Sequence, residues 1–329
     1  MKLLRGLKPF GALKSGVVAT IGNFDGVHLG HQALLNTLIQ RSTTAKLPSM
    51  VILFEPQPGE FFDKQNAPAR LSYLRDKLAQ FESLGIDYVY CLSFNQQLAS
   101  MGPDEFIQTF LCSILNVQHL LIGQDFRFGK NRLGNVSLLH QFLEAQSRSL
   151  EIFSDFKVGG DRVSSTNIRL ALKDGNMQFA KACLGRDYAL CRRVVKGDGR
   201  GREWGIPTAN FAMPKSNLPL KGVFCVNAVK SDKSVFQGVA NIGSRPTVDG
   251  SKNILEVHLL DVNESLYGDL LQIEFLHKLR DEVRFNSIDD LIEQIKSDIE
   301  SARSYFRVNS QQADYRKQMN KDEIQQHTL

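Results

Sequence analysis

The chain has 329 residues, 42% of them hydrophobic, which is enough to bury a sizeable core and to form two domains. The formal net charge of +5 includes no block of like charges, so the sequence favours small anionic ligands such as nucleotides over nucleic acid. No run of about 18 apolar residues predicts a membrane span, and no signal peptide is recognisable, so we expect an unprocessed, soluble protein without membrane partners. Five cysteines without metal or redox spacing indicate reduced thiols and a cytoplasmic location.

Short β-branched runs alternate with helical stretches over the first half of the chain. The runs cover residues 17–21, 50–54, 88–92, 119–123 and 150–153. Between them, apolar residues keep helical spacing at 71–84 and 106–115. This alternation is typical of a parallel sheet flanked by helices, so the sequence predicts a doubly wound, Rossmann-like α/β domain whose ligands bind beyond the carboxyl ends of the strands.

The decamer from Gly22 to His31 follows the first of these runs and leads into a helical pattern. Its three glycines let the backbone approach a ligand closely, and the free amides at the start of a helix form an anion site. His28 and His31 are three residues apart, so they share one helix face and can both donate to phosphate oxygens. A metal pair and two capping histidines are the alternatives. Zinc would need further ligands, but the next histidine is His119 and there is no Cys-x-x-Cys motif.

Two further loops follow predicted strands and are therefore expected at the same edge of the sheet. One comes after the second run and the other after the fourth, and their distinctive residues are Phe54, Pro56, Pro58, Asp125, Phe126 and Phe128. A third candidate is the helix start at residues 163–169. Its hydroxyls can cap the helix, and Arg169 lies one turn beyond Ser165 on the same face. An ordinary capped surface helix is the alternative interpretation.

The pattern changes after a short helical connector at residues 174–187. Residues 188–195, 224–229, 236–241, 255–260 and 270–276 are β-rich without long intervening helices, which predicts a small antiparallel β-barrel. An amphipathic helix that begins at Ser287, with Asp290 as capping partner, is expected to close the barrel. We therefore expect domains at 1–186 and 187–308, and a polar, mobile tail without regular structure at 309–329.

The barrel segment contains a glycine-rich loop at residues 197–205, followed by Thr208 and Asn210. The loop lacks the Gly-x-Gly-x-x-Gly spacing of a dinucleotide site, and a flexible surface loop is the alternative reading. Thr208 and Asn210 offer oxygen ligands of the kind that Mg²⁺ prefers. In the strand at 254–260, alternation places Glu256 and His258 on the face opposite Leu255 and Val257. Glu256 is either one member of a structural ion pair or a general base.

The decamer resembles the His-x-Gly-His signature of nucleotidylyltransferases, in the Gly-x-Phe-Asp-Gly-x-His-x-Gly-His form found in bacterial bifunctional riboflavin kinase/FAD synthetases. The agreement in motifs extends from about residue 17 to residue 306. The resemblance implies an N-terminal nucleotidylyltransferase domain and a C-terminal barrel that acts as riboflavin kinase. It further implies that the barrel makes FMN from riboflavin and ATP, and that the N-terminal domain transfers AMP from a second ATP to FMN, giving FAD and pyrophosphate.

The resemblance also implies roles for individual residues. The phosphates of ATP in the N-terminal domain would be bound by Gly22, Asn23, Phe24, Asp25, Gly26, Ser164, Ser165 and Thr166. The departing pyrophosphate would be clamped by His28, His31 and Arg169, together with Ser165. Flavin would be bound by Phe54, Pro56, Pro58, Asp125, Phe126, Phe128 and Arg280. In the kinase site, ATP would be covered by Gly197, Gly199 and Gly201, Mg²⁺ would be held by Thr208 and Asn210, and Glu256 would be the general base.

Two other functions fit parts of the sequence. One is a nucleotidylyltransferase for another phosphorylated small molecule, with the barrel as its substrate domain. The other is a non-catalytic flavin-binding sensor, which predicts loss of the phosphate-clamping or base residues. The residues that such a sensor would lose are present here as His28, His31, Thr208, Asn210 and Glu256. The sequence does not indicate an oligomeric state.

Overall fold

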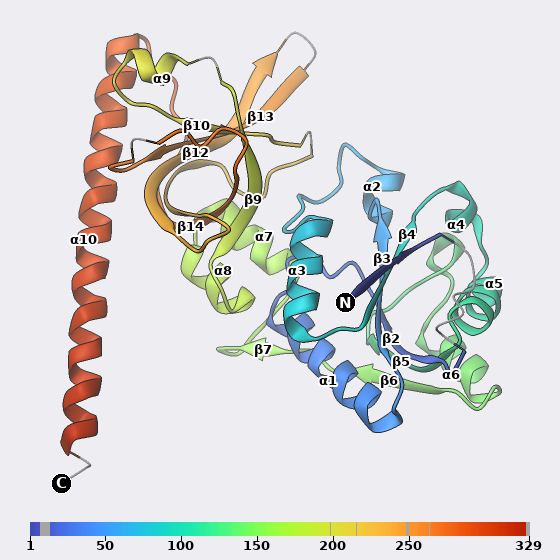
Figure 1. Cartoon of the computed structure of the whole chain (residues 1–329). Helices are drawn as coiled ribbons and strands as arrows, with labels where there is room; N and C mark the ends of the chain where they lie inside the picture. Colours follow the sequence, from blue (N-terminus) through green and yellow to red (C-terminus); the bar gives the residue numbers. More distant parts are fainter. Residues whose placement is uncertain (7–13, 198, 215, 248–249, 263, 327–329) are drawn as a thin grey trace. The chain divides into compact units, whose positions relative to one another are not determined.

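The computed structural model describes residues 1–6, 14–197, 199–214, 216–247, 250–262 and 264–326. The chain divides into two compact units, Met1–Arg169 with Ala182–Gly185 and Leu170–Lys181 with Arg186–Leu329 (Figure 1). Residue 198 of the expected glycine-rich loop and residues 327–329 of the expected tail lie outside the described residues. Within the described ranges, no helix has both the length and the hydropathy needed to cross a bilayer.

The first unit is built on a six-stranded parallel sheet with the strand order β1-β4-β3-β2-β5-β6. Its strands are β1 (Lys2–Arg5), β2 (Val17–Ile21), β3 (Ser49–Glu55), β4 (Tyr88–Ser93), β5 (Val117–Gly123) and β6 (Ser149–Phe153). All five predicted strands are confirmed. The short edge strand β1, which pairs with β4, was not predicted, because two leucines between two basic residues carry little periodic signal.

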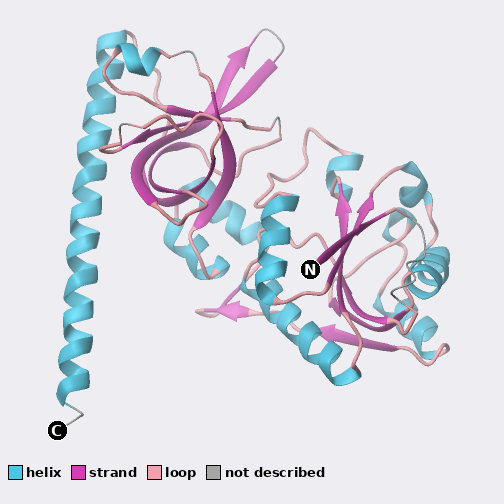
Figure 2. Cartoon of the chain, viewed as in Figure 1, coloured by secondary structure: helices cyan, strands magenta, loops and turns pink. Residues whose placement is uncertain are grey.

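Helices cover both faces of this sheet, as Figure 2 shows. Alternate residues of the strands belong to two separate apolar clusters: Val18 and Val51 pack with Leu35, whereas Ala19 and Met50 pack with Phe110. Because neighbouring residues of a strand point to opposite faces, the two clusters are the two sides of a doubly wound fold. Burial on both faces also explains why the strands are continuous apolar runs.

The helices of this unit are α1 (Leu29–Ala45), α2 (Pro58–Phe62), α3 (Leu74–Leu84), α4 (Gln96–Ser100), α5 (Pro103–Glu105), the π-helix Phe106–Ile114, the short 3-10 helix Lys130–Arg132 and α6 (Val136–Glu144). The helical stretch predicted at 106–115 is confirmed, but its hydrogen bonds are of the π type. A short hairpin of β7 (Lys157–Val158) and β8 (Asp161–Arg162) precedes α7 (Ser165–Asp174) and α8 (Met177–Leu184).

The second unit is a closed antiparallel barrel with the strand order β10-β13-β12-β11-β14-β9. Its strands are β9 (Tyr188–Val195), β10 (Ala209–Phe211), β11 (Gly222–Val229), β12 (Val235–Thr247), β13 (Gly250–Leu259) and β14 (Leu270–Arg280). The barrel prediction is confirmed with all five of its strands. The sixth strand, β10, was missed because three residues are too few for a pattern. The glycine-rich loop contains the short helix α9 (Arg200–Glu203).

The long helix α10 (Ile288–Gln326) begins where the sequence predicts, and the N–H of Asp290 donates to the Oγ of Ser287 at 3.1 Å. Its residues Ala302 and Phe306 pack against the barrel at Val223 and Cys225. The prediction that the chain has no regular structure from residue 309 onward is wrong, because the helix continues to Gln326. Polar composition hides the apolar periodicity of this stretch, but no glycine or proline ends the helix there.

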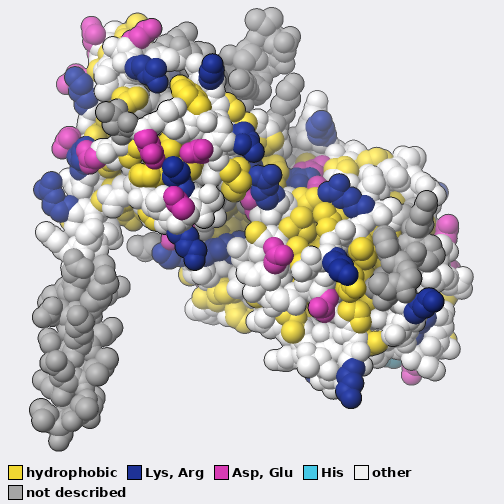
Figure 3. Space-filling view, in the orientation of Figure 1, with side chains coloured by type: hydrophobic (Ala, Val, Ile, Leu, Met, Phe, Trp, Pro, Cys, Tyr) yellow, Lys and Arg dark blue, Asp and Glu magenta, His cyan; other side chains and the backbone are white. Residues whose placement is uncertain are grey.

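On the face shown in Figure 3, Lys and Arg side chains are spread over the surface among Asp and Glu side chains. This distribution agrees with the modest net charge and the mixed charge pattern of the sequence. The described part of this face therefore has no large patch of charged side chains of one sign.

Candidate active sites

The first unit contains a cavity of about 940 Å³ at the carboxyl ends of its strands. Segments that follow β2, β3 and β5 line it, together with the start of α7, which is the position at which open α/β sheets bind ligands. The sequence-predicted residues in this lining are Gly22, Asn23, Asp25, Phe54, Pro58, Asp125, Phe126, Phe128, Ser165 and Arg169. Residues that are distant in the sequence are therefore brought to one cavity.

Other predicted residues of this unit belong to the decamer, the segment after β3 and the start of α7 but are not part of the cavity lining: Phe24, Gly26, His28, His31, Pro56, Ser164 and Thr166. Phe24 is buried, and its ring contacts those of His31 and Phe81. Gly26 has a φ of +84°, and its N–H donates to the Oγ of Ser72 at 2.7 Å. Glycine is required there because the backbone is left-handed and an added Cβ would lie 3.0 Å from Leu71.

His28 and His31 stack with their ring centroids 3.6 Å apart. The Nδ1 of His28 accepts a hydrogen bond from the backbone N–H of His31, so His28 caps α1. An accepting Nδ1 carries no proton, which leaves Nε2–H of His28 as a donor. Burial, then the electrostatic coupling to His28 and the charge of Lys77, hold the pKa of His31 well below its ordinary value. His31 is therefore neutral near pH 7, and the pair offers hydrogen bonds without a full positive charge.

Asp25 is the centre of the contacts that hold α7 to the decamer. Its carboxylate is buried, accepts hydrogen bonds from the backbone N–H groups of Leu71 and Ser72, and forms an ion pair with Arg169. The Oγ of Ser165 donates to the backbone carbonyl of Asp25 at 2.9 Å. Because a carboxylate repels phosphate oxygens, this geometry favours Asp25 as the support of Arg169 rather than as a direct phosphate ligand.

An ion-pair cluster beside this cavity was missed in the sequence analysis. Arg70 forms ion pairs with Glu55, which ends β3, and with Glu60 of α2, and Glu60 lines the cavity. Lys77 of α3 lies 3.9 Å from Glu55. The only sequence signal for this cluster is the acidic Glu55 at the end of an apolar strand.

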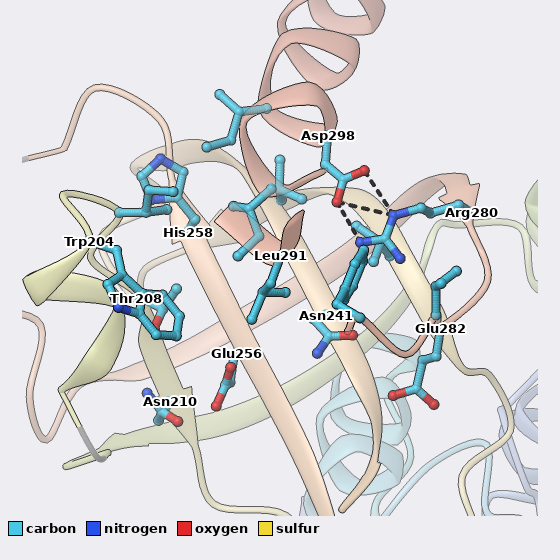
Figure 4. A pocket seen from close by; sticks show the side chains of 18 of the residues that line it. Trp204, Thr208, Asn210, Asn241, Glu256, His258, Arg280, Glu282, Leu291 and Asp298 are labelled. Carbon is cyan, nitrogen blue, oxygen red and sulfur yellow. Dashed lines mark hydrogen bonds and ion pairs between the residues drawn. The ribbon is translucent and has the colours of Figure 1, made fainter. Parts of the chain in front are cut away.

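The second unit contains a cavity of about 390 Å³ (Figure 4). The sequence-predicted residues in its lining are Gly199, Gly201, Thr208, Asn210, Glu256 and Arg280. Asn210 of β10 and Asn241 of β12 both pair in register with Glu256 of β13. Residues directly opposite each other in antiparallel strands project to the same face, so strand pairing alone places these three side chains in one row.

The glycine-rich loop lies closely against the segment that carries Thr208 and Asn210. An added Cβ at Gly197 would lie 2.3 Å from the Nδ2 of Asn210, and one at Gly201 would lie 2.4 Å from the carbonyl oxygen of Ile206. Gly197 is not itself part of the cavity lining. Glycine is required at 201 because a backbone carbonyl lies there, whereas a side chain at 197 would displace the side chain of Asn210.

Arg280 lines the cavity, but its guanidinium is bound to Asp298 of α10. The Nε–H of Arg280 donates to Asp298 Oδ1 at 2.9 Å (Figure 4). Gln294 donates to the same oxygen at 3.0 Å. Leu291 and Ile295 of the same helix are also in the lining. Sequence analysis assigned this helix only to barrel packing, so its contribution to the cavity was missed.

Two further lining residues are Trp204 of the glycine-rich loop and His258 of β13. The Nδ1 of His258 is 2.8 Å from the carbonyl oxygen of Pro207. Because a carbonyl oxygen only accepts, Nδ1 carries the proton, and the contact holds the backbone directly before Thr208. The sequence analysis placed His258 beside Glu256 without assigning it a role.

The donor set of this cavity suits a hard cation that bridges phosphates. A threonine hydroxyl and an asparagine amide offer oxygen atoms, and Mg²⁺ in nucleotide sites takes few protein ligands and completes its shell with phosphate and water. Among the described residues, no cluster of three or more His, Cys, Asp or Glu side chains is arranged to hold a metal by itself. The residues present therefore fit a nucleotide-bound Mg²⁺ better than a permanent metal centre.

Comparison with known proteins gives a consistent result for both units. The family model described as FAD synthetase matches residues 11–167, and that described as riboflavin kinase matches residues 184–306. The bifunctional riboflavin kinase/FMN adenylyltransferase of Haemophilus influenzae is 42% identical over 93% of this chain and 99% of its own length. The Escherichia coli K12 protein of the same name is 45% identical over 93% and 98%. A solved Streptococcus pneumoniae structure, described as a macrolide-efflux protein, is 26% identical, with a TM-score of 0.77 over 92% of this chain and 98% of its own.

Proposed function

The chain belongs to the family of bifunctional riboflavin kinase/FMN adenylyltransferases, and on this premise we propose which of its residues carry each of the two reactions. The chain is an enzyme that makes FMN from riboflavin and FAD from FMN. The 390 Å³ cavity of the barrel is the riboflavin kinase site, and the 940 Å³ cavity of the α/β unit is the adenylyltransferase site. The two family models match the corresponding parts of the chain, which supports this division.

In the kinase site, Glu256 accepts the proton of the ribityl 5′-hydroxyl while that oxygen attacks the γ-phosphorus of ATP. The bond from this phosphorus to the bridging oxygen breaks, and ADP leaves. Thr208 and Asn210 offer the oxygen atoms that would hold Mg²⁺, whose charge neutralises the phosphates. The glycine-rich loop covers ATP. The apolar side chains of α10, with Arg280 beside them, fit the flavin ring.

In the adenylyltransferase site, the nucleophile is a phosphate oxygen of FMN, so no general base is needed. This oxygen attacks the α-phosphorus of ATP, and the bond to pyrophosphate breaks. Nε2–H of His28 and the guanidinium of Arg169 stabilise the departing pyrophosphate, while the hydroxyl of Ser165, which donates to the carbonyl of Asp25, holds the start of α7 against the decamer. The aromatic residues Phe54 and Phe126 offer contacts for the flavin ring. Catalysis here rests on positioning and charge neutralisation.

One observation carries the proposal: two cavities, each within one compact unit, are lined by residues from several of the predicted motifs, and the histidine pair lies in the decamer that also supplies Gly22, Asn23 and Asp25 to the larger one. We also propose ATP with Mg²⁺ as the phosphate donor and the cytoplasm as the location. Four of the five cysteines are buried, and no disulfide joins cysteines among the described residues, which supports a reducing compartment.

The test is to incubate the protein with riboflavin, ATP and Mg²⁺ and to separate FMN and FAD by chromatography. His28→Ala should lower FAD formation by about 10²-fold or more, because it removes a transition-state donor, and should leave FMN formation intact. His140→Ala, which changes an exposed histidine of α6, is the matched control.

Loss of both activities in folded His28→Ala protein would contradict the two-site assignment. Absence of any flavin product from the wild-type chain would instead favour another phosphorylated substrate or a non-catalytic flavin sensor.

A further inference from the structure

Lys77 of α3 is buried, with 1% of its side chain exposed. Lysine is almost never buried to this extent unless its charge is paired. Its Nζ lies 3.9 Å from Oε1 of Glu55. Burial lowers the pKa of Lys77, whereas the carboxylates of Asp25 and Glu55 raise it. The net effect is a pKa below the ordinary value, and the nearby carboxylates are the groups that favour the ammonium form inside the unit.

The position of Lys77 connects the two neighbouring strand ends that form the adenylyltransferase cavity. Asp25 follows β2 and Glu55 ends β3, and these strands are adjacent in the sheet. Asp25 also holds Arg169, and Glu55 also holds Arg70, which in turn binds Glu60. Of this network, Asp25, Glu60 and Arg169 line the cavity.

The network contains three carboxylates (Asp25, Glu55 and Glu60) and three cations (Arg70, Lys77 and Arg169). Both ligands of the cavity, ATP and FMN, carry phosphate. Removal of the Lys77 charge would leave an uncompensated negative charge directly behind them. Asp25 would then attract the guanidinium of Arg169 more strongly and make it less available to phosphate.

We propose that Lys77 is a positioning residue for adenylyl transfer, an internal cation that balances Asp25 and Glu55 so that Arg169 can bind the triphosphate of ATP. This inference rests on the assignment of adenylyl transfer to the larger cavity. Lys77 acts through its neighbours, because it does not line the cavity itself.

The experiment compares Lys77→Met with the double variant Lys77→Met/Glu55→Gln in the full chain, with FMN and ATP supplied directly. Lys77→Met should raise the KM for ATP in FAD formation by about 10-fold or more, the scale of a lost charge interaction. The Glu55→Gln change removes the excess negative charge, so the double variant should return to within about threefold of the wild-type KM. Riboflavin phosphorylation should stay unchanged in both variants, and Lys64→Met, at an exposed lysine of the same unit, should match wild type.

A wild-type KM for ATP in folded Lys77→Met protein would overturn the proposal. So would a double variant whose KM stays high, since that result would make the lysine side chain itself the requirement rather than charge balance. The double variant decides the question even if Lys77→Met alone fails to fold. His28→Ala tests the site assignment separately from the proposal for Lys77. If that variant still forms FAD, the assignment of adenylyl transfer to the larger cavity is wrong, whatever the result for Lys77.

Discussion

Glu256 provides the sharpest test at the scale of single residues, because two neighbouring strands place it beside Asn210 and Asn241. Glu256→Gln keeps the shape of the side chain but removes its ability to accept a proton. If Glu256 is the general base, FMN formation should fall by roughly 10²–10⁴-fold, with riboflavin binding and the conversion of supplied FMN to FAD nearly unchanged. Product chromatography and a melting curve on the same preparation measure both effects.

The competing interpretation of Glu256 is a structural ion pair. In that case the variant should lose about 3–5 kcal/mol of stability, and both activities could fall through unfolding. Glu300→Gln, at an exposed position of α10, controls for the loss of a surface charge. A stable Glu256→Gln protein with normal kinase activity would exclude the catalytic role.

His31 leads to a prediction about pH. Its pKa in the folded chain is far below the ordinary value of 6.5, first because of burial and then because of His28 and Lys77. As the pH falls below 6.5, the unfolded chain takes up a proton at this position while the folded chain does not, so the free energy of unfolding should decrease from pH 7 to pH 5. In His31→Asn, denaturant unfolding at these pH values should show a smaller decrease. An equal decrease in the two proteins would contradict the assignment.

At the scale of elements, α10 divides into a part that serves the barrel and a part that extends beyond it. Between residues 306 and 312, Phe306 is the last buried residue, and Val308 is already 51% exposed. A chain that ends at Val308 should therefore keep both activities, and its Tm should change by no more than about 2 °C, as for other surface changes. Differential scanning calorimetry is the measurement. A large loss of Tm would show that the helix beyond residue 308 has a stabilising partner.

At the scale of the whole molecule, the barrel closes on itself and has its own core, in which Phe224 and Phe275 meet edge to face at 5.5 Å. A fragment from residue 187 onward should therefore fold and phosphorylate riboflavin unaided. A fragment from residue 170 should melt at a higher temperature, because Leu170–Lys181 belongs to the same compact unit and Gly175 lies directly against Lys278. An insoluble or inactive pair of fragments would show that the barrel depends on the α/β unit.

The sequence by itself determined the longer strands of the sheet and of the barrel and their order, because the spacing of apolar residues is a local property that burial imposes on each of them; the short strands β1 and β10 and the end of α10 were missed. The same local logic identified the decamer at Gly22, the helix start at Ser165, the segment from Thr208 to Asn210 and Glu256, since each follows or belongs to a recognisable element. These segments meet in two cavities because the order of the strands brings them to the same part of each unit.

Only the tertiary structure decided which charges face one another. Asp25 and Arg169 are 144 residues apart, and Lys77 meets Glu55 only because α3 packs against one face of the sheet. Arg280 is bound by Asp298, although in the sequence each of these charged residues could equally be an exposed surface residue. Such pairs depend on packing between elements and on desolvation at the contact, and neither leaves a periodic trace in the sequence. For the same reason, the ion pairs that support the adenylyltransferase cavity could not be predicted from the sequence.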